Sequence, residues 1–299
     1  MVIEIRKDYL TGRYTIFSPK RADRPHDVKK KKQKAKCPFC PGNEYMTPPA
    51  VLEMKKNGRW QIRVTPNKFP IMNAHEVVIE SPEHEKDIAM EPVKKIEEIL
   101  DVYAKRYVAL SKQKGIKYVQ IFRNRGEKGG ASLAHPHTQI IGTPAIPALV
   151  SQEMNACKKY RAKYKRCMLC DLAKNESRKE RFVAKNSSFV AFTPYASRYP
   201  YETWIVPVRH ASRISDMDKK QIHDFADMLK KILLKLDKVL NKPAYNFIIH
   251  QSPLRGYGHY HMHLEILPVT TIVAGFEKST DYAVNLTLPE EAAKQLRKV

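Results

Sequence analysis

Two stretches of the chain carry apolar residues at the three- and four-residue spacing of an amphipathic helix. The apolar positions are Val93, Ile96, Ile99, Leu100, Tyr103 and Tyr107 in the first stretch, and Ile222, Phe225, Met228, Leu229, Ile232, Leu233 and Leu236 in the second. Ser215 and Asp218 precede the second stretch and suit the start of a helix. Each stretch is therefore predicted to form a helix that packs one face on a core.

Short runs rich in β-branched and aromatic residues surround these predicted helices. After the first helix come IKYVQIFR (116–123) and HTQIIG (137–142), and after the second come YNFIIH (245–250) and HLEILP (263–268). With a strand-like pair before each helix, the order strand, strand, helix, strand, strand occurs twice. The last two strands of each set are joined without a crossover helix, so we expect antiparallel pairing and an α+β fold.

The same landmarks recur in the same order along the chain. Each half has a CxxC pair, a Thr-Pro, a histidine that ends a strand-like run, and an HxH tripeptide. The landmark histidines are 51 positions apart in both halves (84 to 135, 210 to 261), and the first cysteine precedes the first histidine by 47 positions in one half and 43 in the other. We infer a duplication, with units at residues 1–147 and 148–299 and a linker within residues 144–165.

The composition fits a globular protein outside the membrane. The chain has 299 residues, of which 42% are hydrophobic and 28% charged, and no apolar run reaches membrane-spanning length. The start MVIEIRKDYL lacks the apolar stretch of a signal peptide, so we expect a cytoplasmic location. The net charge of +23 predicts attraction to anions. We interpret the basic run VKKKKQKAK (28–36) as a solvated loop rather than a nucleic-acid patch.

Four of the five cysteines form the pairs CPFC and CMLC, which in a cytosolic chain favour metal binding over disulfides. Zinc takes four tetrahedral ligands, and each half supplies two histidines at matching places. The predicted structural zinc sites are Cys37, Cys40, His84 and His135 in the first half, and Cys167, Cys170, His210 and His261 in the second. Cys157 is left over, and its simplest interpretation is a buried, unreactive thiol.

The tripeptide HPH at positions 135–137 gives its two histidines different roles. If His135 is a zinc ligand, His137 remains free beside a rigid metal site. Neutral imidazole is a competent nucleophile near pH 7. His137 is therefore the candidate nucleophile.

Six segments together resemble the galactose-1-phosphate uridylyltransferase family of the histidine-triad superfamily. They are CPFCPGNE (37–44), RVTPNKFP (63–70), SPEH (81–84), NRGEKGGAS (124–132), HPHTQ (135–139) and HQSP (250–253). The resemblance extends from about Tyr9 to beyond Phe276 and implies two tandem histidine-triad-like units. It also implies transfer of a nucleoside monophosphate between a nucleotide sugar and a hexose 1-phosphate, most simply UDP-glucose and galactose 1-phosphate. His137 would carry the nucleotidyl group, and Gln139 would hydrogen-bond its phosphoryl oxygens.

The resemblance implies further substrate contacts in both halves. The matched positions are Arg21 and Arg24 as nucleotide-contacting arginines, Asn67 and Phe69 in a base-binding segment, and Glu277 in a hexose-binding segment, VAGFE (273–277). Ser132 and the loop of Gly129 and Gly130 lie just before His137, where backbone N–H groups could approach phosphate oxygens, and Asn124 and Arg125 stand where this phosphate loop begins. In the family the hexose-binding segment reaches the active site of the partner subunit, which implies a homodimer.

Two departures from the family pattern leave the substrate open. Position 68 is Lys where the better-known members carry Asp, and Thr271 stands where Lys is usual. Members that keep the second CxxC include adenylyl-type sugar phosphorylases, so ADP-sugar chemistry is an alternative. Other members bind a second ion, which can be iron, with one Glu and three His. That set maps to Glu153, His250, His261 and His263; we favour the cysteine set, because thiolates bind zinc more tightly and match the repeat.

Three other interpretations use the same motifs. The first is a dinucleotide phosphorylase or hydrolase that uses His137 but passes the nucleotide to phosphate or water. The second is a zinc-knuckle nucleic-acid binder, which we disfavour because no aromatic residue is interleaved with the basic run at 28–36. The third makes His263 a second nucleophile, and it is disfavoured because Glu265 replaces Gln139 there and would repel phosphate.

Overall fold

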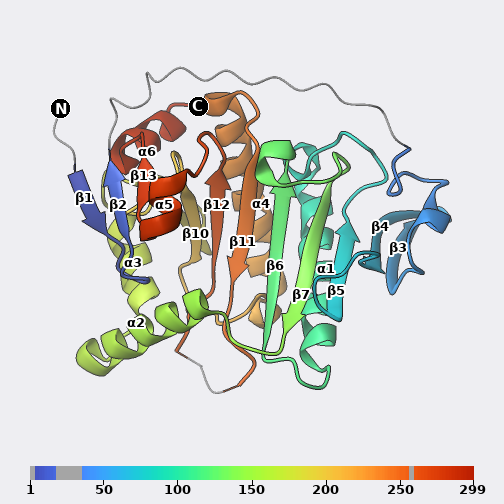
Figure 1. The fold of residues 1–299 in the computed structure, drawn as a ribbon, viewed down its shortest axis with the longest axis horizontal. Helices are drawn as coiled ribbons and strands as arrows, with labels where there is room; N and C mark the ends of the chain where they lie inside the picture. Colours follow the sequence, from blue (N-terminus) through green and yellow to red (C-terminus); the bar gives the residue numbers. More distant parts are fainter. Residues whose placement is uncertain (1–3, 18–35, 256–258) are drawn as a thin grey trace.

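The computed structural model describes residues 4–17, 36–255 and 259–299, and its centre is a ten-stranded sheet (Figure 1). In spatial order the strands are β3 (Leu52–Lys56), β4 (Arg59–Pro66), β5 (Ala74–Ile79), β7 (His137–Thr143), β6 (Tyr118–Arg125), β11 (Tyr245–His250), β12 (His263–Pro268), β10 (Thr203–Pro207), β9 (Phe189–Phe192) and β8 (Phe182–Lys185). Every neighbouring pair in this order is antiparallel. The predicted α+β class with antiparallel strands is confirmed.

The two halves of the sheet repeat one arrangement. The predicted order of strand, strand, helix, strand, strand corresponds to β4, β5, α1 (Val93–Ser111), β6 and β7 in the first half, and to β9, β10, α4 (Lys219–Leu240), β11 and β12 in the second. β6 pairs with β11, with Arg125 opposite Tyr245, so the sheets of the two units are continuous. The second half therefore lies directly beside β6, the strand that precedes the HPH tripeptide.

The two long helices lie side by side and cover one face of the sheet (Figure 1). The predicted apolar positions of both helices are buried, except for the half-buried Val93. A capping box starts α4: the Asp218 carboxylate accepts the Gln221 N–H at 2.8 Å, and the Gln221 side-chain oxygen accepts the Asp218 N–H at 3.1 Å. Ser215 lies one turn earlier and does not cap the helix. Asp218 alone supplies the predicted start signal.

The remaining elements are not part of the large sheet. They are the small sheet of β1 (Glu4–Lys7), β2 (Tyr14–Phe17) and β13 (Ala283–Asn285), the helices α2 (Ala148–Tyr164), α3 (Met168–Glu176), α5 (Gly275–Thr280) and α6 (Pro289–Arg297), and the 3-10 turns η2 (Glu44–Met46), η3 (Ile88–Met90), η4 (Glu127–Gly129) and η5 (Ile214–Asp216). The basic run at residues 158–166 falls mainly on α2 and is largely solvated. The unit boundary at residues 147 and 148 stays a prediction. Among the described residues, none of the helices is both long and apolar enough to cross a bilayer.

Candidate functional site

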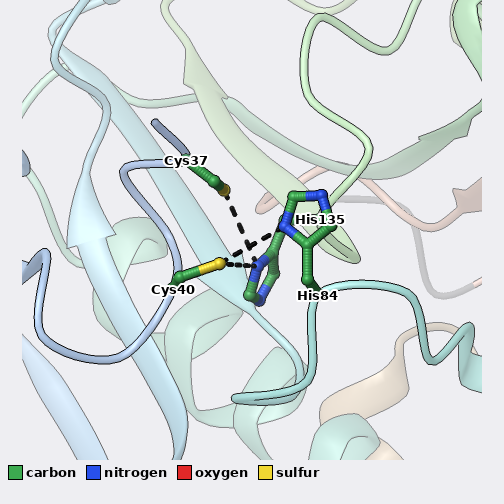
Figure 2. A group of neighbouring side chains, drawn as sticks. All are labelled: Cys37, Cys40, His84 and His135. Carbon is green, nitrogen blue, oxygen red and sulfur yellow. Dashed lines mark hydrogen bonds between the residues drawn. The ribbon is translucent and has the colours of Figure 1, made fainter. Parts of the chain in front are cut away.

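The four predicted ligands of the first half converge at one point (Figure 2). His84 follows β5, His135 precedes β7, and the two cysteines come from the loop before η2. The Cys40 sulfur lies 3.3 Å from His84 Nδ1 and 3.6 Å from His135 Nδ1, and the Cys37 sulfur lies 3.8 Å from His135 Nδ1. These separations match the edges of a tetrahedron around zinc, which are about 3.5 Å for S and N ligands at their usual bond lengths.

A second interaction fixes the orientation of His135. Its Nε2 lies 2.8 Å from the carbonyl oxygen of Ser81, so Nε2 carries the proton and Nδ1 keeps its lone pair for an ion. Metal-binding histidines usually have such a partner on the other ring nitrogen. Burial also lowers the pKa of His135, which favours the neutral ligand form. The donor set of this cluster therefore fits a metal ion.

The second half contains the matching cluster. His261 Nδ1 lies 3.4 Å from the Cys167 sulfur and 3.3 Å from the Cys170 sulfur, and His210 Nδ1 lies 3.4 Å from Cys167. The hydrogen bond from the Cys170 thiol, joined by those with His210 and His261, lowers the pKa of Cys167. A lowered thiol pKa favours the thiolate form that binds metal, and this donor set also fits a metal.

The four residues of the alternative ligand set for the second ion, one Glu and three His, do not lie together in the structure. His261 turns toward the cysteines, whereas Glu153, His250 and His263 group with Glu265 in a separate, fully buried cluster. His250 lies between the two carboxylates, with Nδ1 3.1 Å from Glu153 and Nε2 3.4 Å from Glu265. Burial opposes a charged imidazole, but Glu153 and Glu265 outweigh it and raise the pKa of His250 to about 10. These four side chains form a buried network of ion pairs, and their ligand atoms also lie close enough together to hold a metal ion.

His137 begins β7 beside the first cluster and points its free nitrogen at a cavity. Its Nδ1 lies 2.8 Å from the carbonyl oxygen of His135, so Nδ1–H donates and Nε2 keeps a lone pair. Burial, helped by the charge of Arg123, lowers the pKa of His137 and keeps the ring neutral. The ring of Phe39, inside the CPFC loop, contacts His137 edge-on with centroids 5.3 Å apart. The first cluster thus holds both the carbonyl and the aromatic ring that orient the nucleophile.

The cavity in front of His137 measures about 340 Å³. Of the predicted site residues, it is lined by Asn67, Phe69, Ser132, His137 and Gln139. Its size lies in the range of small-ligand pockets. Residues from β4, β5, β7 and the phosphate loop thus form one site around the candidate nucleophile.

The phosphate loop is shaped by the second half of the chain. The side-chain amide of Asn246, in β11, donates to Asn124 Oδ1 at 2.8 Å and to the carbonyl oxygen of Gly129 at 2.7 Å. Gly129 packs so closely on β11 that a Cβ atom there would lie 3.0 Å from the Tyr245 carbonyl oxygen, and Gly130 has a φ of +83°. A glycine is required at both places. No sequence pattern indicates Asn246, because its partners lie across the junction between the halves.

Several predicted residues lie elsewhere. Glu277 and Thr271 line a separate cavity of about 140 Å³, so Glu277 does not reach His137 of its own chain. Arg125 turns away from the phosphate loop and pairs with Asp237 of α4 and with Asp87. Arg21 and Arg24, like most of the basic run at 28–36, lie outside the described residues. Their assigned roles stay predictions.

The chain matches known proteins over almost its full length. Family models described as galactose-1-phosphate uridyl transferase, N-terminal and C-terminal domains, match residues 72–147 and 153–299. ADP-glucose phosphorylase of Arabidopsis thaliana is 35% identical over 99% of this chain and 93% of its own length. The galactose-1-phosphate uridylyltransferase of Thermotoga maritima is 30% identical, over 99% of this chain and 98% of its own.

Solved structures give the same likeness. The crystal structure of the Arabidopsis ADP-glucose phosphorylase with bound ADP-glucose superposes with a TM-score of 0.91 at 34% identity, covering 100% of this chain and 99% of that one. A uridylyltransferase structure superposes with a TM-score of 0.79 at 29% identity, covering 99% and 97%.

Proposed function

Because the chain belongs to the galactose-1-phosphate uridyl transferase family, we propose that it moves a nucleoside monophosphate from a nucleotide sugar to a second phosphate-bearing acceptor through His137. One observation carries this proposal. The Nδ1–H of His137 is held by the His135 carbonyl, which leaves the Nε2 lone pair facing a cavity that Gln139 and Ser132 also line. The arrangement suits nucleophilic attack on phosphorus rather than proton transfer.

The reaction has two balanced steps. Nε2 attacks the α-phosphorus, the bond from phosphorus to the bridging oxygen breaks, and the sugar 1-phosphate leaves with the electron pair. The nucleotidyl-imidazole keeps its proton on Nδ1, where the His135 carbonyl stabilises the positive charge. In the second step an oxygen of the acceptor phosphate attacks the same phosphorus, and His137 leaves as neutral imidazole. No general acid is needed, because a phosphate ester is a good leaving group.

The two Cys₂His₂ clusters would hold zinc, with a structural role in both halves. Four protein ligands close each site, so no position is left for substrate. In the first half, the ion would fix the CPFC loop and His135, and with them the Phe39 ring and the carbonyl that orient His137. The ion of the second half would stabilise that half, which carries no proposed nucleophile.

For the substrate, UDP-glucose with a hexose 1-phosphate acceptor is the first candidate, and ADP-glucose with orthophosphate is the second. The second candidate is favoured by Lys68, which lines the cavity beside Asn67 and Phe69. An ammonium group only donates hydrogen bonds, so it cannot accept from the N3–H of uracil, whereas adenine in a nucleotide has no ring N–H that needs an acceptor. The likeness to a phosphorylase that binds ADP-glucose supports the same choice.

The acceptor site is proposed to be shared between two copies of the chain. Glu277 sits on α5 in a cavity apart from His137, and Ile272 and Phe276 beside it expose much of their apolar surface. An exposed apolar segment suits burial against a second subunit. A homodimer would bring Glu277 of one copy to the acceptor sugar in the other.

The test is intact-protein mass spectrometry after incubation with UDP-glucose or, separately, with ADP-glucose. The mass retained identifies the nucleotide, and we expect it on the wild type but not on His137→Gly. Labelled protein is then given galactose 1-phosphate, orthophosphate or buffer alone, and the acceptor that clears the label identifies the reaction. Clearance in buffer alone would indicate a hydrolase. A wild type that gains no mass from either nucleotide sugar would overturn the proposal.

A further inference from the structure

His75 is a buried histidine beside the cavity that none of the roles above uses. It lies in β5, and its side chain is only 4% exposed. In the pairing of β5 with β7, Val77 lies opposite Gln139 and His75 opposite Ile141, so His75 and Gln139 are diagonal neighbours on one face of the sheet. His75 Nε2 lies 2.9 Å from Gln139 Oε1. The histidine thus contacts the residue expected to bind the phosphoryl group.

The surroundings of His75 determine which ring nitrogen carries the proton. The backbone N–H of Ile71 points at Nδ1 at 3.3 Å, and a backbone N–H can only donate. Nδ1 must therefore accept, which places the proton of the neutral ring on Nε2. Burial lowers the pKa of His75, in keeping with a neutral ring.

This proton fixes the orientation of the Gln139 side chain. Nε2–H of His75 donates to the amide oxygen of Gln139, so the amide NH₂ of Gln139 is the end left for the cavity. An NH₂ group stabilises the oxygens of a phosphoryl group, whereas the amide oxygen would repel them. Without His75, both orientations of the amide become accessible.

The same imidazole contacts the predicted base-binding segment. The side-chain oxygen of Asn67 accepts the N–H of Phe69 at 2.9 Å, so its amide nitrogen faces His75 Nε2 at 3.1 Å. Of the two neighbours of Nε2, only Gln139 offers an acceptor, so the Nε2 proton goes to Gln139 and not to Asn67.

We infer that His75 is a positioning residue for nucleotidyl transfer, whose N–H holds the Gln139 amide with its NH₂ group toward the phosphoryl group on His137. This inference rests on the proposed function. His75 itself touches neither His137 nor the reacting phosphorus, and it acts through Gln139.

The test compares His75→Leu, which removes the donor, with His75→Gln, whose amide nitrogen sits near the place of imidazole Nε2. The single-turnover rate of His137 labelling is measured with the nucleotide sugar that labels the wild type, together with the KM of that substrate. Losing the oriented donor is expected to slow labelling by roughly 10- to 100-fold with little change in KM, because the contact is made to the developing charge. His75→Gln is expected to stay within about threefold of the wild-type rate.

A double-mutant cycle separates positioning from general damage. In a Gln139→Ala background, His75→Leu should cause no further loss, because the group it orients is gone. Metal content and thermal unfolding of each variant show whether it has folded. Equal losses from His75→Leu in both backgrounds, or a folded His75→Gln as slow as His75→Leu, would overturn the inference. A wild type that takes no label overturns the proposed function as well, whereas a labelled wild type with an unaffected His75→Leu overturns only the role of His75.

Discussion

His137 and His263 occupy the same place in the two repeats, yet their surroundings are opposite. Each is the second histidine of HxH, and each begins the strand, β7 or β12, that lies second from the centre of the sheet. His137 keeps a small exposed surface and lines a cavity. His263 is completely buried, with its ring packed between Trp204 and the charged His250.

Two substitutions along the paired strands account for the difference. Opposite Gln139 stands Val77, which lines the cavity, whereas opposite Glu265 stands Trp204, whose indole lies 5.0 Å from the ring of His263. The indole therefore packs on the ring of His263 at the position that Val77 holds beside the cavity of the first half. Glu265 then pairs with Arg198 and His250, where Gln139 offers a neutral amide to the cavity. The second repeat thus keeps the strands and the Cys/His cluster but excludes a phosphate ligand.

The comparison teaches that the two halves share a scaffold, whereas the proposed chemistry needs the open surroundings of only one of them. The second half still contributes to the site, because the side chain of Asn246 in β11 donates a hydrogen bond to the backbone of the phosphate loop, at Gly129. A repeat that no longer binds substrate can therefore remain necessary to the repeat that does. Substitutions at matched positions of the two halves test this division.

The largest effect is expected at the two matched histidines. His137→Gly removes the only proposed nucleophile and should lower turnover by at least about 10⁴-fold, as loss of a nucleophile does elsewhere. His263→Ala should leave turnover nearly unchanged but lower the free energy of unfolding by roughly 2–4 kcal/mol, because it empties a packed site. Turnover and urea unfolding are measured for both. A folded but inactive His263→Ala would contradict the hypothesis that only the first half carries the nucleophile.

Removing a metal ligand should also affect the halves differently. His135→Ala and His261→Ala are each expected to lose about one ion per chain, by elemental analysis, and to unfold more easily. Activity should fall much further in His135→Ala, because Phe39 and the His135 carbonyl orient His137. Equal activity losses in the two variants would show that both clusters act only through global stability.

Converting Gln139 to the residue found in the second half should cost less than losing the nucleophile. In Gln139→Glu a carboxylate of the same shape faces the phosphoryl oxygens and repels them. The single-turnover labelling rate is expected to drop by about 10²-fold, comparable to loss of an oxyanion-hole donor. Gln139→Met is the matched control, since it removes the donor without adding charge and should be less harmful. If Gln139→Glu labels at the wild-type rate, the amide has no part in the reaction.

Val77→Trp gives the first half the tryptophan that the second half has at the corresponding position, Trp204. The indole would occupy the space beside Gln139 and raise the KM of the nucleotide sugar by at least about tenfold, which is 1.4 kcal/mol of binding free energy. The overpacked strand should lose roughly 1–3 kcal/mol of stability. Val77→Ile, a smaller increase in the same position, is the control. An unchanged KM in a folded Val77→Trp would mean that the substrate does not bind in this cavity.

The sequence was informative where function depends on neighbours within a motif or on a repeated spacing. The equal spacing of the histidines grouped both Cys/His clusters, and HPHTQ grouped His137 with Gln139. The sequence did not indicate contacts between residues that are far apart along the chain and meet only because their strands are neighbours in the sheet. His75 lies 64 positions from Gln139, and Asn246 lies 117 from Gly129. Alternation indicates which face a strand residue occupies, but not which strand lies beside it.

The smallest expected effect concerns pH, and it compares the neutral His75 of the first half with the charged His250 of the second. Burial lowers the pKa of His75 below its usual 6.5, and the hydrogen bond to Gln139 only partly opposes the shift. Below pH 6.5 the unfolded chain binds a proton at His75 that the folded chain does not bind. The free energy of unfolding therefore decreases as the pH is lowered, by at most about 1.4 kcal/mol per pH unit. His75→Gln removes this linkage. Its free energy of unfolding in urea should therefore fall less than that of the wild type between about pH 7 and pH 5. Parallel curves would mean that the folded protein accepts a proton on His75, which the Ile71 N–H and the assigned tautomer do not allow.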